Sequence, residues 1–198
     1  MANPNKVQQR RRQVRRLAVW AGALLFLVFL GILLLRPATG YALREMYPRT
    51  YREYVERYSR EYGVDKNLVY AVAKIESNFQ PDAHSHADAR GVMQMTKDAF
   101  EWVQYRMGDE SDATYQEIFD PEVAIKYGTY MLKLLQEEMG SDTLTLCAYH
   151  AGMSNVRAWL ENEAYSSDGE TLDVIPYSDT NWYVEKVLEA KSIYQRIY

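Results

Sequence analysis

The sequence predicts a mainly α-helical globular domain that follows one N-terminal apolar helix. Apolar and aromatic residues recur at intervals of three and four through most of residues 49–198, and no segment shows sustained alternation of apolar and polar residues. Helix-capping residues and glycines stand where these runs begin and end. With 198 residues, of which 47% are hydrophobic, the chain is long enough for one well-buried core and short for two.

The N-terminal region is basic and then apolar. The first 36 residues contain seven Lys and Arg and no Asp or Glu, and residues 17–35 carry no charge. That stretch is close to the ~20 residues that cross a bilayer core as a helix. We therefore interpret residues 1–16 as a cytoplasmic basic segment and residues 17–35 as a transmembrane anchor. The positive-inside rule then places the rest of this single-pass chain outside the cytoplasmic membrane.

A cleaved signal peptide is the alternative for the same segment. Its apolar stretch would be about 7 to 15 residues long and would end at a small-x-small cleavage site. The uncharged stretch here is longer, and the sequence after it offers only a poor site between Ala38 and Ala42. We therefore expect an uncleaved anchor. Residues 36–48, which hold two prolines and a glycine, then form a connector to a domain over residues 49–198.

Helices follow one another along this domain. Gly63 is placed to end the first, Asp65 can cap the second, and Asp120 followed by Pro121 is a favourable start for a third. The predicted helices are residues 51–62, 65–76, 120–139, 142–151, 154–162 and 179–198. Helical spacing fails in the 80s and 90s, where a small β-hairpin is the alternative.

Composition excludes some classes of function. Beyond residue 36 acidic residues outnumber basic ones, whereas phosphate binding needs clustered Lys and Arg, so no nucleic-acid partner is expected. Cys147 is the only cysteine, which excludes an internal disulfide and a Cys-based zinc site. Its apolar neighbours predict a buried thiol.

Glu76 is the candidate for acid–base chemistry. It follows Val72 by four residues and Leu68 by eight, so a helix places all three on one face. A carboxyl on an apolar face loses hydration, which raises its pKa, and a group that must donate a proton to a leaving oxygen needs a raised pKa. From the spacing alone, a solvated or ion-paired glutamate at a helix end is the alternative.

The segment that begins at Glu76, ESNFQPDAHSHADARGVMQMTKDAF, resembles the signature of the lytic transglycosylase catalytic domain, of the soluble-lytic-transglycosylase type. The matching positions are Glu76, Ser77, Phe79, Pro81, Ala83, Ser85, Gly91, Met93, Gln94 and Met95. Downstream, DPEVAIKYGTYMLKLL, AYHAG and IPYSDTNWYVEKV resemble later blocks of that family in order and distance. The resemblance covers about residues 50–198 and implies a fold related to goose-type lysozyme.

The resemblance also implies a reaction. Glu76 would protonate the glycosidic oxygen between N-acetylmuramic acid and N-acetylglucosamine in peptidoglycan, and would later act as the base. The N-acetyl group and C6 hydroxyl of the substrate would then complete a 1,6-anhydro end without a second carboxylate and without a cofactor. The residues that the resemblance places at the substrate are Ser85, Met93, Gln94, Tyr149, His150 and Tyr183.

Some of these residues also have a purely structural interpretation. Tyr149 and Tyr183 suit core packing, and Gln94 suits a turn. His84 and His86 form a His-x-His between two aspartates, which is a pattern compatible with zinc, but the family uses no metal and we expect none. His150 replaces the asparagine of the family block, and because imidazole titrates near neutral pH, it predicts an added pH dependence.

Two other functions remain open at this stage. A muramidase would hydrolyse the same bond with water, and a non-catalytic glycan-binding scaffold could keep the same fold. The presence of Glu76 with both tyrosines favours an enzyme. Endo or exo action, oligomeric state and protein partners leave no signature in the sequence.

Overall fold

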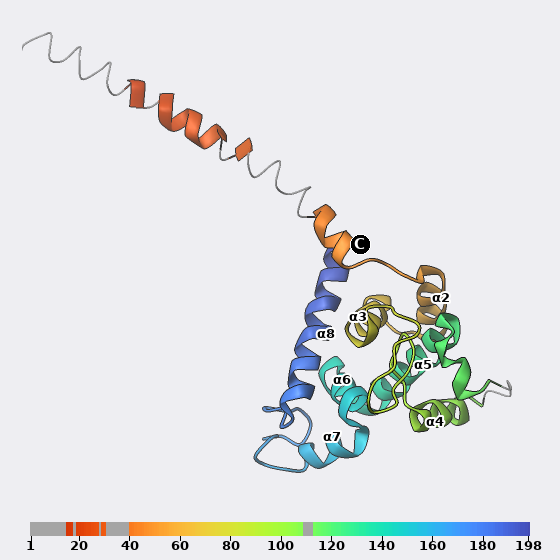
Figure 1. The fold of residues 1–198 in the computed structure, drawn as a ribbon. Coiled ribbons are helices and arrows are strands. Elements are labelled where there is room, and N and C mark those ends of the chain that lie inside the picture. The colour runs from red at the N-terminus through yellow and green to blue at the C-terminus, as the bar shows by residue number, and fades with distance from the viewer. Residues whose placement is uncertain (1–14, 18, 28, 31–39, 109–112) are drawn as a thin grey trace, which may run out of the picture. The chain divides into compact units, whose positions relative to one another are not determined.

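The computed structural model describes residues 15–198 with the exception of 18, 28, 31–39 and 109–112. The chain divides into two compact units, Met1–Met46 and Tyr47–Tyr198. The second unit holds the helices labelled in Figure 1. It therefore contains all the residues for which a role in chemistry is predicted.

In the first unit, the described residues between 15 and 30 are helical, and large apolar side chains such as Trp20 and Phe26 are exposed. A search of the described residues for a helix long and apolar enough to span a membrane finds none. The predicted anchor, residues 17–35, falls partly outside the described residues, and residues 1–14 of the basic segment fall outside them entirely. The anchor stays a prediction.

The predicted connector is partly helical. Residues 40–46 form helix, and the backbone leaves the helical conformation at Tyr47. The stretch after Gly40 includes Ala, Leu, Arg, Glu and Met, which have high helix propensity, and this propensity outweighs the flanking prolines. Residues 40–46 of the predicted connector are therefore helical, and residues 36–39 lie outside the described residues.

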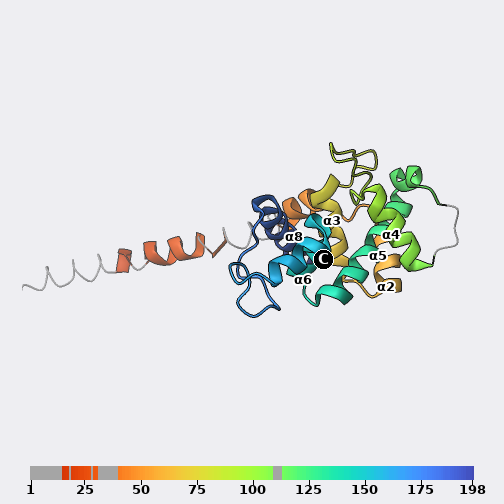
Figure 2. The ribbon, with the colours of Figure 1, turned by 90° about the horizontal axis from the view of Figure 1, so that it is seen from below.

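All the regular elements among the described residues of the second unit are helices, so the mainly α-helical prediction is confirmed (Figures 1 and 2). In chain order its elements are α2 (Arg52–Tyr62), α3 (Lys66–Ser77), α4 (Lys97–Met107), the 3-10 helix η1 (Tyr115–Phe119), α5 (Pro121–Met139), α6 (Asp142–Ala151), α7 (Met153–Leu160) and α8 (Ser178–Ile197).

Local capping explains where the predicted helices begin. The Asp65 carboxylate accepts a hydrogen bond from the Asn67 backbone N–H at 2.9 Å, and the Asp120 carboxylate accepts one from the Glu122 N–H at 2.7 Å. Each bond satisfies an N–H that has no partner within the helix. The starts of α3 and α5 are thus confirmed at the residues that the sequence indicated.

Two elements are additional to the predicted ones. Thr96 caps α4 through the Ala99 N–H, at 3.3 Å, but α4 buries only Phe100 and Val103. The apolar stripe that reveals a helix in a sequence is therefore weak in α4. The short helix η1 buries only Ile118, which gives periodicity even less to detect.

The core is built around α3. Its residues Leu68 to Ala73 are completely buried, and the helix packs mainly against α8, while α5 packs against α2 and α6. Cys147 on α6 is also buried, as predicted, and burial raises the pKa of its thiol to about 11. Since α3 runs through the core, its last turn delivers Glu76 to the edge of the apolar interior.

Residues 78–95, here named the site loop, join α3 to α4. Two isolated antiparallel bridges, His84 with Arg90 and Arg90 with Met95, take the place of the predicted β-hairpin, and the described residues contain no strand. Gln94 is one of several residues of this loop with positive φ. Such residues turn the backbone repeatedly, so two regular strands cannot run side by side, and the hairpin prediction is wrong.

Candidate active site

Glu76 lies in the last turn of α3, on the face that Leu68 and Val72 bury. Its side chain is partly buried, and the loss of hydration raises its pKa from 4.5 to about 7. The carboxyl therefore holds its proton close to neutral pH. This is the electrostatic behaviour that its apolar face predicts.

Tyr183 approaches Glu76 from α8. The residue is only 3% exposed, and its hydroxyl has no hydrogen-bond partner of adequate geometry among the described residues. It is nevertheless close enough to Glu76 to oppose the rise in the pKa of that carboxyl. Burial, and then the negative charge on Glu76, hold the pKa of Tyr183 well above its ordinary value. The phenol is thus a protonated donor beside the acid, without a closed hydrogen bond.

Tyr149 lies on the same side, at the end of α6. Its hydroxyl donates to the Met93 carbonyl at 2.7 Å, which ties α6 to the site loop. Burial and the charge on Glu76 raise the pKa of Tyr149 well above its ordinary value. Both hydroxyls are close enough to Glu76 for its charge to raise their pKa, and contact of either tyrosine with a substrate stays a prediction.

Met93 contributes to this region through its backbone. Its side chain is completely buried, and a Cβ added to Gly128 on α5 would lie 2.7 Å from the Met93 Cγ. The side chain therefore occupies a core position, which corrects the expectation that it lines a cleft. A glycine in the middle of α5 was the signal for this close approach, and sequence reasoning gave it no role.

Ser85 and Gln94 use polar groups to hold the site loop together. The Gln94 Nε2 donates to the carbonyls of Ala83, at 3.1 Å, and Gly91, at 3.0 Å, while the Ser85 Oγ accepts from the Ala89 N–H at 3.1 Å. These bonds fit the turn interpretation of Gln94. Contact of either residue with a substrate stays a prediction.

Ser77 and Gly91 fasten the site loop to its surroundings, and neither had an assigned chemical role. The Ser77 Oγ donates to the Val92 carbonyl at 2.8 Å, which joins the end of α3 to the loop. Gly91 has φ of 71°, and a Cβ there would lie 2.1 Å from the Ile118 carbonyl oxygen. Only glycine fits this position.

His150 follows Tyr149 and contacts α8. Its Nδ1 lies 3.0 Å from the Thr180 Oγ1, and its ring lies 4.6 Å from the Tyr183 ring at an interplanar angle of 30°. Burial lowers the pKa of His150, and the charge on Asp179 opposes this effect. The structure thus brings Glu76, Tyr149, His150 and Tyr183 into one cluster.

His84 of the His-x-His motif makes a hydrogen-bond contact with a carboxylate. The His84 Nε2 lies 2.6 Å from Asp88 Oδ1, and the same carboxylate oxygen accepts from the Arg90 Nε at 2.8 Å. The part of the chain that the structure describes contains no group of three or more His, Cys, Asp and Glu residues arranged to hold a metal ion.

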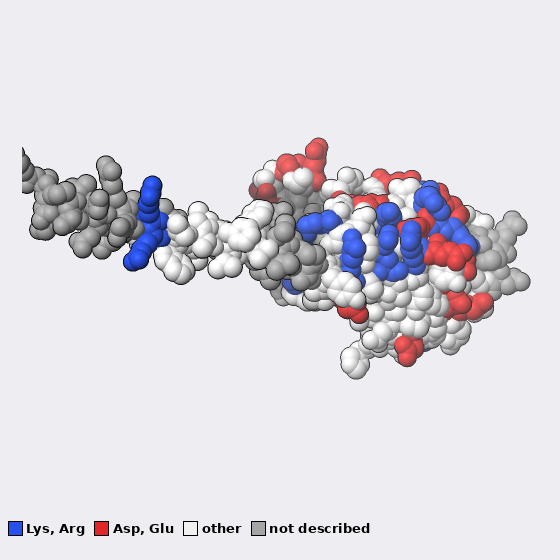
Figure 3. Space-filling view, turned by 90° about the horizontal axis from the view of Figure 1, so that it is seen from above, with Lys and Arg blue, Asp and Glu red and all other residues white. Residues whose placement is uncertain are grey.

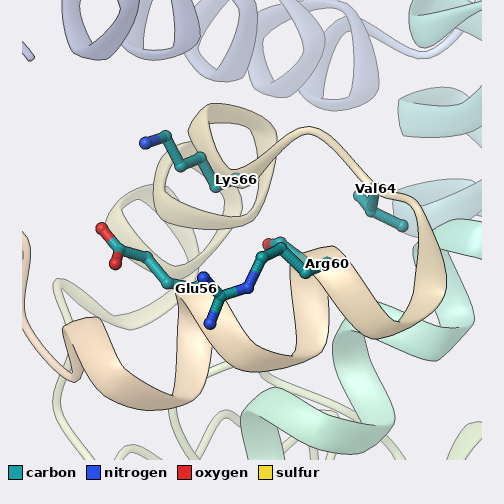
Figure 4. A pocket seen from close by; sticks show the side chains of 5 residues that line it. Glu56, Arg60, Val64 and Lys66 are labelled. Carbon is teal, nitrogen blue, oxygen red and sulfur yellow. The ribbon is translucent and has the colours of Figure 1, made fainter.

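A separate pocket lies between α2 and the start of α3 (Figure 4). It has a volume of about 230 Å³ and is lined by Glu56, Ser59, Arg60, Val64 and Lys66. None of the predicted site residues lines it. The Glu56 carboxylate accepts from Arg52 at 2.9 Å, which lowers its pKa, the opposite of what a proton donor requires. This pocket is distinct from the Glu76 cluster.

Comparison with known proteins identifies the family. Residues 53–171 match the model of the transglycosylase SLT domain. The chain belongs to this family. The match includes Glu76, the site loop and α6, and it ends before α8, so the placement of Tyr183 beside Glu76 comes from the structure and not from the family match.

Curated relatives of this chain are named lytic murein transglycosylases. The chain is 28% identical over 155 residues to the soluble lytic murein transglycosylase of Escherichia coli K12, an alignment that covers 77% of this chain and 24% of the relative. It is 29% identical over 163 residues to the membrane-bound lytic murein transglycosylase C of Salmonella paratyphi B, which covers 72% and 45% respectively. The chain thus spans about a quarter to under a half of these relatives.

Solved structures share the fold. The 70 kDa soluble lytic transglycosylase of Escherichia coli superposes with a TM-score of 0.70 at 26% identity, over 78% of this chain and 25% of that one. An inactive glutamate-to-glutamine mutant of the lytic transglycosylase Slt from Pseudomonas aeruginosa superposes with a TM-score of 0.66 at 25% identity, over 76% and 24%. The lysozyme-like helical fold implied by the motif is therefore confirmed.

Proposed function

We propose that this SLT-domain chain is a peptidoglycan lytic transglycosylase. It cleaves the β-1,4 bond between N-acetylmuramic acid and N-acetylglucosamine and leaves 1,6-anhydro-N-acetylmuramic acid ends. The observation that carries the proposal is the Glu76 carboxyl, whose pKa of about 7 and two neighbouring phenols suit a group that acts first as acid and then as base.

In the first step the protonated Glu76 carboxyl gives its proton to the glycosidic oxygen. The bond from that oxygen to C1 of the muramic acid residue breaks, and the N-acetylglucosamine side leaves with a free hydroxyl. Positive charge develops at C1, and the substrate N-acetyl group is the neighbour that stabilises it. Glu76 is then a carboxylate, which the protonated Tyr183 hydroxyl stabilises as a nearby donor.

In the second step the Glu76 carboxylate takes the proton of the C6 hydroxyl. The C6 oxygen attacks C1 of the same sugar and closes the 1,6-anhydro ring, so no water is consumed. Glu76 is protonated again and ready for another cycle. A pKa near neutrality serves both steps, because the group must give and recover a proton at the same pH.

We assign to the substrate the residues that the family motif indicates. They are Ser85, Met93, Gln94, Tyr149, His150 and Tyr183, with Met93 acting through its backbone. The assignment is supported by the contacts that link the site loop, α6 and α8 around Glu76. The inactive glutamate-to-glutamine mutant of the Pseudomonas relative supports a role for a carboxyl in that protein.

Product analysis with purified glycan strands tests the proposal. The wild-type chain should release muropeptides with anhydro ends, each lighter by one water than the corresponding reducing end, and Glu76→Gln should release none. Reducing ends alone would identify a muramidase and overturn the anhydro mechanism. Cleavage that persists in a folded Glu76→Gln protein would remove Glu76 from the reaction, and absence of cleavage by the wild type would indicate a glycan-binding scaffold.

We further propose that residues 17–35 anchor the catalytic domain, residues 49–198, to the outer face of the cytoplasmic membrane. The uncharged stretch and its basic flank support this, and one relative carries a membrane-bound name. The full chain should remain with membranes after carbonate extraction, whereas a chain that begins at residue 47 should not. Release of the full chain would contradict the anchor.

Anchoring also bears on the charge of the domain, which is acidic overall although Lys and Arg gather on one of its faces (Figure 3). A tether raises the local concentration of an enzyme at the wall, so weak affinity for an anionic polymer suffices. Activity on intact walls should therefore fall less with truncation at high salt than at low salt, because salt screens repulsion between acidic partners. An equal loss at both salt concentrations would contradict this explanation.

A further inference from the structure

The last turn of α6 presents consecutive side chains to the two sides of Glu76. Tyr149 contacts the site loop, where its hydroxyl is held by the Met93 carbonyl at 2.7 Å. His150 contacts α8, where its Nδ1 lies beside the Thr180 hydroxyl and its ring lies beside the Tyr183 ring. This turn of α6 therefore connects both walls of the candidate site.

The two contacts of His150 fall on one face of α8. Thr180 and Tyr183 are three residues apart, which places them side by side on a helix. Thr180 is 1% exposed and Tyr183 is 3% exposed, whereas His150 is itself exposed, so the hydrogen bond and the ring contact are closed to water only on the α8 side. A hydrogen bond and a ring contact together restrain both the first turn of α8 and the orientation of the Tyr183 ring.

The Tyr183 hydroxyl needs such a restraint more than Tyr149 does. Tyr149 is fixed at its own hydroxyl by the Met93 carbonyl, whereas the Tyr183 hydroxyl has no hydrogen-bond partner among the described residues. The position of that hydroxyl is therefore determined by what holds its ring. His150 supplies one such contact, at a centroid distance of 4.6 Å.

We propose that His150 is a positioning residue that holds the Tyr183 hydroxyl beside the Glu76 carboxyl. The inference rests on the proposed function of Glu76 and extends it to a residue that replaces the family asparagine. His150 acts through Tyr183 and does not itself exchange a proton with the substrate. An asparagine could keep a hydrogen bond to Thr180, but it has no ring to place against Tyr183.

The expected effect on Glu76 has a definite sign. The titratable groups whose charges act on Glu76 or respond to it are Tyr183 from α8 and Tyr149 from α6, and the charged group that faces His150 is Asp179 from α8. Tyr183 lowers the pKa of Glu76, since it favours the carboxylate. Displacement of Tyr183 should therefore raise that pKa and move the alkaline limb of the kcat profile to higher pH.

The test compares kcat and KM across pH for His150→Ala, His150→Phe, Tyr183→Phe and the double variant of His150→Ala with Tyr183→Phe. His150→Ala should lower kcat about tenfold, because the Tyr183 hydroxyl would lie further from Glu76 and would stabilise its carboxylate less. The alkaline limb of the kcat profile of His150→Ala should move to higher pH, as in Tyr183→Phe. His150→Phe keeps a ring, so its alkaline limb should lie close to that of the wild type. The alkaline limb of the double variant should be displaced no further than that of Tyr183→Phe.

Several outcomes would overturn the inference. One is a folded His150→Ala protein whose kcat profile keeps the wild-type alkaline limb. Another is an alkaline limb displaced as far in His150→Phe as in His150→Ala. The third is a larger displacement in the double variant than in Tyr183→Phe. Should His150→Ala fail to fold, Thr180→Val removes one contact at nearly constant shape and should move the limb in the same direction by less. An active Glu76→Gln protein would instead overturn the proposed function, so the two failures are distinguishable.

Discussion

The two walls that flank Glu76 are built in different ways. The site loop is a chain of turns whose polar side chains, such as those of Gln94 and Ser85, hydrogen-bond to its own backbone. The opposite wall consists of side chains on regular helices, where Tyr149, His150 and Tyr183 extend from α6 and α8 toward the acid.

Because of this difference, substitutions in the two walls should affect stability and activity differently. A helix satisfies its own backbone, so the helical wall can leave the Tyr183 hydroxyl without a partner. A loop has no such internal ladder and must use side chains to satisfy carbonyls such as those of Ala83 and Gly91. We therefore expect changes in the loop to lower stability and activity together, and changes around Glu76 on the helical side to lower activity alone.

Glu76→Gln should produce the largest effect on activity. Removal of a general acid costs about 10² to 10⁴ in kcat. The wild-type kcat should itself fall as pH rises through about 7, because the carboxyl then loses the proton that it must donate. The measurement is the initial rate of anhydro-end formation against pH, and a flat profile from pH 5 to 9 would exclude Glu76 as the acid.

The same substitution should increase stability at alkaline pH. The folded state raises the pKa of Glu76 from 4.5 to about 7, so it favours the protonated form, and the contribution of Glu76 to stability is fully present below pH 4.5 and is lost as pH rises through 7. A neutral glutamine avoids this loss. Glu76→Gln should therefore exceed the wild type by about 3 kcal/mol in free energy of unfolding at pH 8, and match it more closely at pH 4.

Gly91→Ala tests the loop wall and should be strongly destabilising. A Cβ at Gly91 would lie 2.1 Å from the Ile118 carbonyl oxygen and would also meet a φ of 71°. We expect a loss of about 3 kcal/mol or more in unfolding free energy, measured by denaturant titration. Gly63→Ala is the matched control, since φ is 74° and no atom lies within 4 Å, and it should lose only about 1 kcal/mol. Equal losses would refute the close approach.

Gln94→Ala should cost about 1 to 2 kcal/mol, because it removes two hydrogen bonds to carbonyls in the loop. Activity should fall with stability. Gln80→Ala, at an exposed position of the same loop, is the control and should change neither. A folded Gln94→Ala protein with wild-type stability but raised KM would show instead that this side chain serves only the substrate.

His150→Asn should have the smallest effect of these variants. An asparagine can keep a hydrogen bond to Thr180 but loses the ring, so kcat should fall by less than the tenfold expected for His150→Ala, and the acidic side of the pH profile should change. Burial lowers the pKa of His150, so the neutral ring is favoured, and protonation of the ring as pH falls below its ordinary range disfavours the folded arrangement. Asp179, which faces the ring, moderates this effect. The wild type should therefore lose kcat and stability on acidification in a way that the asparagine variant does not, and coincident profiles would refute the pH dependence.

Much of the helical scaffold was predictable because its signals are local. Asp65 and Asp120 cap the helices that they were expected to cap, and α6 occupies the predicted residues. Helix α4 was not predicted, because it buries only Phe100 and Val103 and so has a weak apolar stripe. The β-hairpin was wrong because failure of helical spacing does not distinguish a strand from a run of turns.

The sequence named Glu76, Tyr149, His150 and Tyr183, which the structure brings into one cluster, but it did not indicate the contacts around them. The motif includes Glu76, Met93 and Gln94, but it did not indicate that the Met93 side chain is buried against Gly128. Nor did it assign Ser77 its bond to the Val92 carbonyl. Each of these contacts joins residues that different elements bring together, so no periodicity along the chain records it.

By itself, the sequence determined that Glu76 lies on an apolar helical face and belongs to a motif of the SLT family, because helical period and residue identity are local properties. Only the tertiary structure decided what surrounds that carboxyl. Burial and the approach of α6 and α8 set its pKa and place His150 against Tyr183. The pKa depends on desolvation and on charges within a few ångströms, and those neighbours are more than 70 residues away along the chain.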